Sequence, residues 1–235
     1  HFVRRRQRQM CIRDRNIIFE TPPNTEGEPT AKCLIFVTPD AQRSMNTFLG
    51  ASTELRPSDI SKDLIGRSKI LYLEGYLWDP PNAKKAFLEA INIAKAADTK
   101  VALSLSDAFC VDRYRSEFLD LVRTHVDILF GNEIELLSLY QVENLNEAIG
   151  LVQDDCEIVA VTRDSRGSIV IENRRVFEIA AQKIDTVIDT TGAGDLYASG
   201  FLYGITRDMD IRQCGKLGGL CLLYTSDAAD DVRSV

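Results

Sequence analysis

The fold class follows from four short apolar runs: KILYLEG at residues 69–75, KVALSL at 100–105, VDILFGN at 126–132 and EIVAVT at 157–162. Each run has the length and the branched side chains of a buried strand. Helical patterns separate the runs, at residues 82–97, 114–125 and 145–154. Because this alternation is typical of a parallel sheet with helices on both faces, we expect an α/β protein with a three-layer α/β/α arrangement.

A glycine-rich segment, DTTGAGD at residues 189–195, precedes an amphipathic helical pattern. Gly192, Ala193 and Gly194 have small side chains, so the backbone can turn tightly and bring several N–H groups close to a ligand. They fall where a helix N-terminus leaves N–H groups unpaired and attracts anions. Asp195 falls in the first turn, where its carboxylate could accept a proton from a hydroxyl that attacks a bound phosphoryl group. The segment therefore predicts a phosphoryl-transfer site.

The same residues also fit a simpler interpretation. Thr190 or Thr191 could cap the helix, and an acidic residue in the first turn suits any helix dipole. The segment also lacks the lysine of a Walker A loop. From residue types alone, both interpretations stay open.

Residues 189–204, DTTGAGDLYASGFLYG, resemble the C-terminal signature of the ribokinase-like (PfkB) family of carbohydrate and nucleoside kinases. The resemblance implies the ribokinase-like fold, with a mostly parallel sheet and a small β lid. It also implies that Asp195 is the catalytic base and that the stretch from Gly192 to Gly194 is the anion hole. Thr191, in the same motif, becomes a candidate for nucleotide binding.

A second motif, NEIE at residues 132–135, follows the third apolar run. It resembles the Asn-x-x-Glu motif that this family associates with Mg²⁺ and the phosphates. Asn132 and Glu135 are therefore the candidate metal residues, and Asn132 is also a candidate for nucleotide binding. Oxygen ligands just after a strand suit a hard cation that keeps much of its water shell. Without the resemblance, two polar residues in a solvated first turn of a helix are the more usual explanation of the motif.

A third motif, TRDSRG at residues 162–167, lies where the family has a nucleotide-binding turn that resembles Thr-x-Gly-x-x-Gly. Thr162 and Gly167 are the candidates for contact with ATP. Asp164 stands at the first glycine position, and Asp adopts positive φ less readily than Gly, so the shape of the turn is open. A plain approach to the hairpin expected from SIVIENRRVFEIA, residues 168–180, is the alternative. Since sites in such folds collect at the carboxyl ends of strands, we expect these motifs to meet at one edge of the sheet.

Residues 30–52 predict two strands around a Pro-Asp turn, and in the family such strands form a small lid over the sugar or nucleoside. Asp40, Arg43 and Asn46 are the polar candidates for substrate contact. By composition alone, ordinary turn chemistry is the preferred explanation of these three residues. Together with LYLEGYLWDPPNA and LSLSDAFCVDRYR, the segment resembles the adenosine-kinase-like branch of the family.

The two ends of the chain look different from the rest. Residues 5–15, RRQRQMCIRDR, can be encoded by a transposon-type sequencing-library adapter, and the reverse complement of that DNA encodes CLLYTSDAAD, residues 221–230. We therefore expect residues 1–15 and 221–235 to be adapter-derived, and residues 16–220 to be a truncated kinase domain with its lid strands at about 31–52. Members of this family begin with a further strand and a Gly-Gly substrate motif and end with more helix. We expect the polypeptide to be inactive as written.

Charge and composition argue against other classes of function. The formal net charge is −7, and the arginine cluster lies in the adapter-like N-terminal segment, so we expect no nucleic-acid partner. No apolar run approaches the roughly 18 residues of a membrane span, so we expect no membrane partner. Cys33, Cys110, Cys156 and Cys214 include no Cys-x-x-Cys pair, which indicates reduced thiols and a cytoplasmic protein. His125 is expected to be structural, at a helix end.

The resemblance implies a kinase that uses ATP and Mg²⁺ and whose complete form phosphorylates a primary hydroxyl of a nucleoside or sugar. The 5′-hydroxyl of adenosine is the preferred acceptor. A sugar kinase of the ribokinase or fructokinase type is the alternative within the family. A non-catalytic nucleotide or sugar binder is the alternative from another class, because Asp164 departs from the motif. Homodimers occur in the family, so the resemblance also allows a homodimer.

Overall fold

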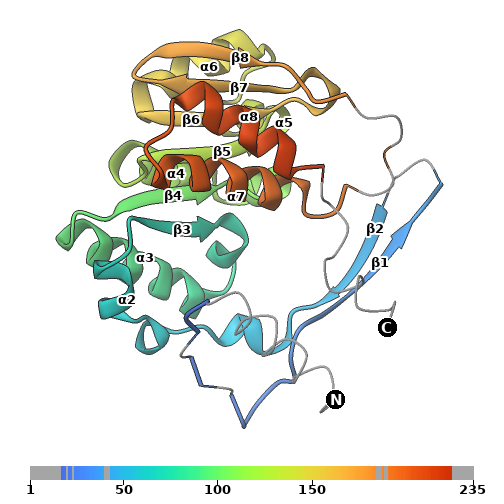
Figure 1. The fold of residues 1–235 in the computed structure, drawn as a ribbon. Coiled ribbons are helices and arrows are strands. Elements are labelled where there is room, and N and C mark those ends of the chain that lie inside the picture. The colour runs from blue at the N-terminus through green and yellow to red at the C-terminus, as the bar shows by residue number, and fades with distance from the viewer. Residues whose placement is uncertain are drawn as a thin grey trace.

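The structure is a computed structural model that describes residues 17–19, 21–22, 24–39, 43–183, 187 and 190–223. A six-stranded sheet forms its centre (Figure 1), in the order β3 (Ile70–Glu74), β4 (Lys100–Ser104), β5 (Ile128–Asn132), β6 (Ile158–Thr162), β7 (Ser168–Glu172) and β8 (Arg175–Ile179). Strands β3 to β6 are parallel, whereas β7 and β8 are antiparallel to their neighbours. The four apolar runs are therefore the four parallel strands, and the expected hairpin is β7–β8.

Helices cover both faces of this sheet (Figure 1). One face packs against α3 (Pro81–Ala96), α4 (Ala108–Thr124), α5 (Glu133–Tyr140) and α6 (Leu145–Asp155). The other face packs against α7 (Ala193–Thr206) and α8 (Ile211–Cys221). The three-layer α/β/α sandwich expected from the sequence is confirmed.

Alternation along the strands assigns side chains to the two cores. On β5, Leu129 belongs to the core with α3 to α6, whereas Ile128 and Phe130 belong to the core with α7 and α8. Successive side chains of a strand point to opposite faces of the sheet, and both faces here are buried, which is why the runs are continuously apolar. On β3 the same alternation places Tyr72 and Glu74 on the face covered by α7.

A separate two-stranded antiparallel sheet, β1 (Lys32–Val37) and β2 (Arg43–Phe48), lies beside the main body (Figure 1). Every residue of both strands is exposed, including large apolar side chains such as Leu34, Phe36 and Met45. The two strands fall within residues 30–52, where the sequence predicts strands, and their role as a lid stays a prediction. Asp40 lies outside the described residues.

The short connecting helices were not expected from the sequence. They are η1 (Gly50–Glu54), η2 (Pro57–Asp59), α2 (Lys62–Gly66), η3 (Gly75–Trp78) and η4 (Asp164–Arg166). Helix α4 also begins earlier than the helical pattern at 114–125, because the Asp107 carboxylate accepts a hydrogen bond from the Phe109 N–H at 2.7 Å and caps a first segment. The backbone at Tyr114 is non-helical, so the apolar periodicity is interrupted there.

Two further expectations concern single features. His125 is the C-cap residue of α4, at a helix end as expected. Within the described ranges, the structure contains no helix with the length and apolar character needed to cross a membrane. Helix α8 continues to Cys221, the first residue of the C-terminal segment assigned to an adapter, so the boundary at residue 220 stays a prediction.

Candidate active site

Helix α7 begins at the glycine-rich motif. Its N-cap is Gly192, whose φ of 74° is a conformation that glycine adopts readily, so neither preceding threonine occupies the capping position. Ala193 and Gly194 follow in the first turn, where backbone N–H groups lack partners within the helix. Among the described residues, a Cβ atom added to Gly194 would meet no atom within 4 Å. The Ala193 N–H already donates to the Thr190 carbonyl oxygen at 3.2 Å, so the backbone at Gly194 is the part of the motif that is open to a ligand.

Asp195 lies beside this open backbone. One carboxylate oxygen, Oδ2, is 3.8 Å from the position that a Cβ atom would take on Gly192. Solvent reaches Asp195, but the surrounding protein removes part of the hydration of its carboxylate and raises its pKa, and the nearby charge of Glu74 acts in the same direction. A raised pKa makes the carboxylate a better proton acceptor than an ordinary aspartate.

Glu74, the last residue of β3, is a site residue that the sequence reasoning missed. The Tyr72 hydroxyl donates to its Oε1 at 2.5 Å, and the Ser106 hydroxyl donates to its Oε2 at 2.7 Å, so both carboxylate oxygens are held. Its charge raises the pKa of Asp195 and of Glu135, so it lies near both carboxyl groups. The available signal was its position at the carboxyl end of a parallel strand.

Asn132 and Glu135 form a reciprocal cap at the start of α5. The Glu135 N–H donates to Asn132 Oδ1 at 2.8 Å, while the Asn132 N–H donates to Glu135 Oε2 at 2.9 Å and its side-chain amide donates to Oε1 at 2.7 Å. Glu135 is only 7% exposed, and burial raises its pKa to about 7, with Asp107 and Glu74 acting in the same direction. NEIE is therefore a capped helix start, as the simpler interpretation expects, but Glu135 is buried rather than solvated, and the role of the motif in binding stays a prediction.

This arrangement limits how the motif could hold a metal ion. Within the described part of the chain, no group of three or more His, Cys, Asp or Glu side chains is arranged to hold a metal. Each Glu135 oxygen already accepts a hydrogen bond from Asn132, so the cap occupies part of the carboxylate's capacity to bind a cation. Because Mg²⁺ retains much of its water shell, a contact through bound water fits these two residues.

The nucleotide turn forms despite its missing first glycine. Asp164 adopts a φ of 50°, and the Gly167 N–H donates to the Asp164 carbonyl at 3.2 Å, so the turn closes. Gly167 has a φ of 83°, and a Cβ atom there would lie 2.1 Å from the Ile179 carbonyl oxygen. Position 167 therefore accepts only glycine, whereas position 164 tolerates an aspartate in a left-handed conformation.

The structure brings the three motifs to one edge of the sheet. Asn132 on β5 is paired in register with Thr162 on β6, and Thr162 is paired with Ser168 on β7. The Tyr197 hydroxyl, two residues beyond Asp195 in α7, donates to the Ser168 hydroxyl at 2.8 Å. Both residues of this hydrogen bond are buried, so it ties the first turns of α7 to the strand ends that carry the other two motifs.

The three predicted lid residues differ in their placement. Arg43 reaches the motif before α7, since its guanidinium donates to the Thr190 hydroxyl at 2.5 Å. Asn46 is paired with Leu34 in the lid sheet and is exposed. Asp40 is not among the described residues. The lid therefore supplies one cation to the loop.

Two exposed aromatic side chains follow the ends of β3 and β4. Tyr76 is 58% exposed and Phe109 is 81% exposed. The Tyr76 hydroxyl donates to the carbonyl oxygen of Ser106 at 3.2 Å, and the hydroxyl of the same Ser106 donates to Glu74. Exposed rings at the carboxyl edge of a sheet provide flat apolar surface next to polar groups, a feature that the sequence reasoning did not single out.

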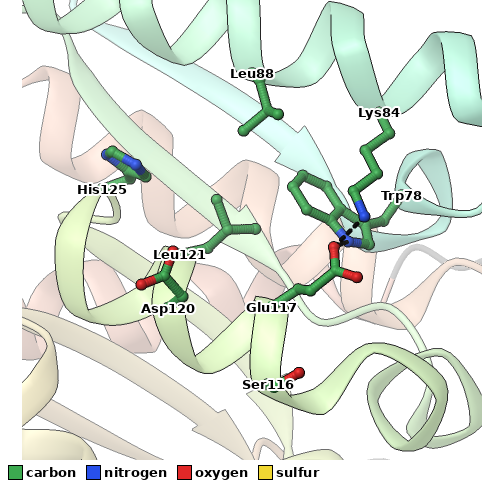
Figure 2. Close-up of a pocket in the computed structure, with 8 residues that line it drawn as sticks. All are labelled: Trp78, Lys84, Leu88, Ser116, Glu117, Asp120, Leu121 and His125. Carbon is green, nitrogen blue, oxygen red and sulfur yellow. Dashed lines mark hydrogen bonds and ion pairs between the residues drawn. The ribbon is translucent and has the colours of Figure 1, made fainter.

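A hollow of about 300 Å³ lies between α3 and α4 (Figure 2). It is lined by Trp78, Lys84, Leu88, Ser116, Glu117, Asp120, Leu121 and His125. The Trp78 indole N–H donates to Glu117 at 2.8 Å, and Lys84 pairs with the same carboxylate, so these polar groups satisfy one another. None of the candidate site residues lines this hollow, and the candidate chemistry lies instead at the open edge of the sheet.

Comparisons with known proteins agree with this fold and motif set. The family described as "pfkB family carbohydrate kinase" matches residues 11–221. An adenosine kinase from Sinorhizobium meliloti is 48% identical with a TM-score of 0.88, over 91% of this chain and 66% of that one. A probable sugar kinase from Rhizobium etli CFN 42 has the same identity and TM-score, over 91% of this chain and 65% of that one.

A curated relative, 5-dehydro-2-deoxygluconokinase from Listeria monocytogenes, is 31% identical over 175 residues. The match covers 72% of this chain and 54% of the Listeria protein. The chain thus spans about half the length of this relative.

Proposed function

We propose, from the premise that this chain belongs to the pfkB family of carbohydrate kinases, that its protein transfers the γ-phosphoryl group of ATP to a primary hydroxyl. One observation carries the proposal: the Asp195 carboxylate lies at the start of α7, where the backbone at Gly194 is open to a ligand. Phosphoryl transfer depends mainly on positioning and charge stabilisation, and a base beside an anion-binding helix start supplies both.

The reaction follows from these positions. The oxygen of the acceptor hydroxyl attacks the γ-phosphorus while Asp195 accepts the proton of that hydroxyl. The bond between the γ-phosphorus and the β,γ-bridging oxygen breaks, and ADP is released. The N–H groups of the first turn of α7 stabilise the negative charge of the transferred group. Arg43, held at the loop by Thr190, adds a positive charge from the lid side.

Mg²⁺ would neutralise phosphate charge when bound with the nucleotide. Asn132 and Glu135 are the residues we propose for it, through bound water, because their own oxygens are engaged in the cap. Thr162, Gly167 and Thr191 are the residues we propose to contact the nucleotide.

Adenosine is the acceptor that we propose. The exposed rings of Tyr76 and Phe109 offer surfaces on which a purine base could stack, whereas a sugar alone would leave them without a partner. The similarity to the Sinorhizobium adenosine kinase supports this choice. A sugar kinase is the second candidate, favoured by the equal similarity to the Rhizobium protein.

Three finer assignments complete the proposal. Asp40, Arg43 and Asn46 contact the substrate from the lid. The protein acts in the cytoplasm, which is supported by the free thiols of Cys110, Cys156 and Cys214. Its partners are small molecules and, in a homodimer, a second copy of the chain.

The test begins with resequencing the source DNA across both ends, so that the protein can be assayed with its true termini. Phosphate transfer from labelled ATP to adenosine, ribose and fructose is then measured. Asp195→Asn should lower kcat on the order of a hundredfold or more, whereas Asp120→Asn, an exposed acid on α4, should not change it. Nucleotide binding without turnover would instead favour the non-catalytic binder, and a preference for free sugars would favour the sugar kinase.

A further inference from the structure

An ion pair joins two of the motifs. Arg166 in the nucleotide turn pairs with Glu133, the residue that follows Asn132 at the start of α5. Asn132 and Thr162 are paired on adjacent strands, so this ion pair bridges the carboxyl ends of β5 and β6. Arg166 remains 59% exposed on its side chain, whereas Glu133 is 24% exposed.

The second arginine of the turn has a different environment. Only 12% of the Arg163 side chain is exposed, and its guanidinium lies 3.6 Å from a Glu178 oxygen and 3.4 Å from the Arg166 carbonyl oxygen. Arg163 therefore contacts the turn with a mostly buried guanidinium and stabilises the shape of the turn. Asp164 is the remaining charged group of the turn and is exposed. Of the two arginines, only Arg166 has a guanidinium that a ligand in solvent can reach.

We propose that Arg166 binds the phosphate chain of the nucleotide, and that its pair with Glu133 is a resting contact which the phosphate replaces. The inference rests on the proposed function, because it needs a nucleoside triphosphate at this edge of the sheet. A guanidinium binds phosphate oxygens with two parallel hydrogen bonds and prefers this more highly charged partner to a single carboxylate.

The exchange is energetically easy. Ion pairs as exposed as this one contribute little to stability, because water competes for both charges. Glu133 lies in the first turn of α5, where the helix dipole stabilises its negative charge after Arg166 has left. Glu133 thus holds the arginine in place without binding it strongly.

The test uses the protein of the phosphoryl-transfer assay, with Arg166→Gln, Arg166→Lys and Glu133→Gln. Arg174→Gln is the matched control. Arg174 lies in the hairpin turn at the other end of β7 and forms an exposed ion pair with Asp154 of α6 at 2.9 Å. We expect Arg166→Gln to raise the KM for ATP on the order of tenfold with kcat nearly unchanged, and Arg166→Lys to restore part of the loss. Glu133→Gln should leave this KM unchanged or lower it, and the KM for the acceptor should not respond to any of these variants.

The outcomes separate this inference from the proposed function. An active protein in which Arg166→Gln leaves the KM for ATP unchanged overturns the role of Arg166 and leaves the kinase proposal standing. An equal rise in KM in Arg166→Gln and Glu133→Gln shows that the pair only maintains the shape of the turn, and this too overturns the exchange. A wild-type protein that neither binds ATP nor transfers phosphate overturns both proposals.

Discussion

Arg43 and Thr190 are 147 positions apart in the sequence, and the Arg43 guanidinium donates a hydrogen bond to the Thr190 hydroxyl at 2.5 Å. This bond connects the first residue of β2 with the loop that leads into α7. The loop is where we propose that the transferred phosphoryl group binds. A cation from β2 is therefore held at the loop that precedes α7.

The first prediction concerns this cation. Arg43→Ala should lower kcat at least about tenfold, because the phosphoryl group loses a charged hydrogen-bond donor. The unfolding midpoint should hardly change, since every residue of β2 is exposed. Steady-state kinetics and thermal unfolding measure the two effects. Lys32→Ala, at the exposed start of β1, is the control, and an equal loss of kcat in that variant would contradict the assignment.

The second prediction concerns the pH dependence of stability. Burial raises the pKa of Glu135 from 4.5 to about 7, so between these values the folded protein holds a proton that the unfolded chain has lost. The contribution of Glu135 is therefore fully present below pH 4.5 and is lost as the pH rises through about 7. A shift of this size corresponds to on the order of 3 kcal/mol in the free energy of unfolding.

Urea unfolding at pH 5 and pH 8 tests this dependence. In Glu135→Gln, stability should fall less between the two pH values than in the wild type, although the substitution also weakens the cap with Asn132. Glu147→Gln, an exposed acid in the first turn of α6, should keep the wild-type difference. Equal pH dependence in all three proteins would show that Glu135 is ionised normally.

The third prediction concerns the strained position in the nucleotide turn. Asp164 has a φ of 50°, a left-handed conformation that costs a residue with a Cβ atom roughly 1 kcal/mol. Asp164→Gly removes the Cβ atom and should therefore raise stability by up to about 1 kcal/mol, whereas Asp164→Ala keeps the Cβ atom and should not gain it. Chemical denaturation of the two variants gives the comparison. If alanine proves as stable as glycine at this position, the turn does not require a left-handed residue there.

The fourth prediction concerns the close approach of α7 and α8. A Cβ atom on Gly204 would lie 2.7 Å from the Cys214 sulfur and 3.1 Å from the Cys214 Cα, so the helices would have to separate. Gly204→Ala should cost about 1–3 kcal/mol of stability. The control is Gly219→Ala in α8, where a Cβ atom meets none of the described residues within 4 Å and alanine should stabilise the helix by up to about 1 kcal/mol. Thermal unfolding distinguishes the two, and equal effects would contradict the close packing.

The sequence was most informative where structure depends on neighbouring residues. The apolar runs identified all four parallel strands, because strands buried on both faces are continuously apolar. It was less informative at α4, whose pattern breaks at Tyr114, and at Glu74. A single acid at the end of a strand carries no distinctive motif, and its importance arises largely from Ser106 and Asp195, which come from other parts of the fold.

The sequence by itself determined the strand and helix order and the position of GAGD at a helix start, because glycine conformation, apolar periodicity and helix ends are local properties. Only the tertiary structure decided which side chains meet there: Arg43 with Thr190, Glu133 with Arg166, and Tyr197 with Ser168. These contacts depend on which strands are adjacent and on which face each side chain points to. No local pattern encodes them, because the packing of two distant segments is set by the whole core between them.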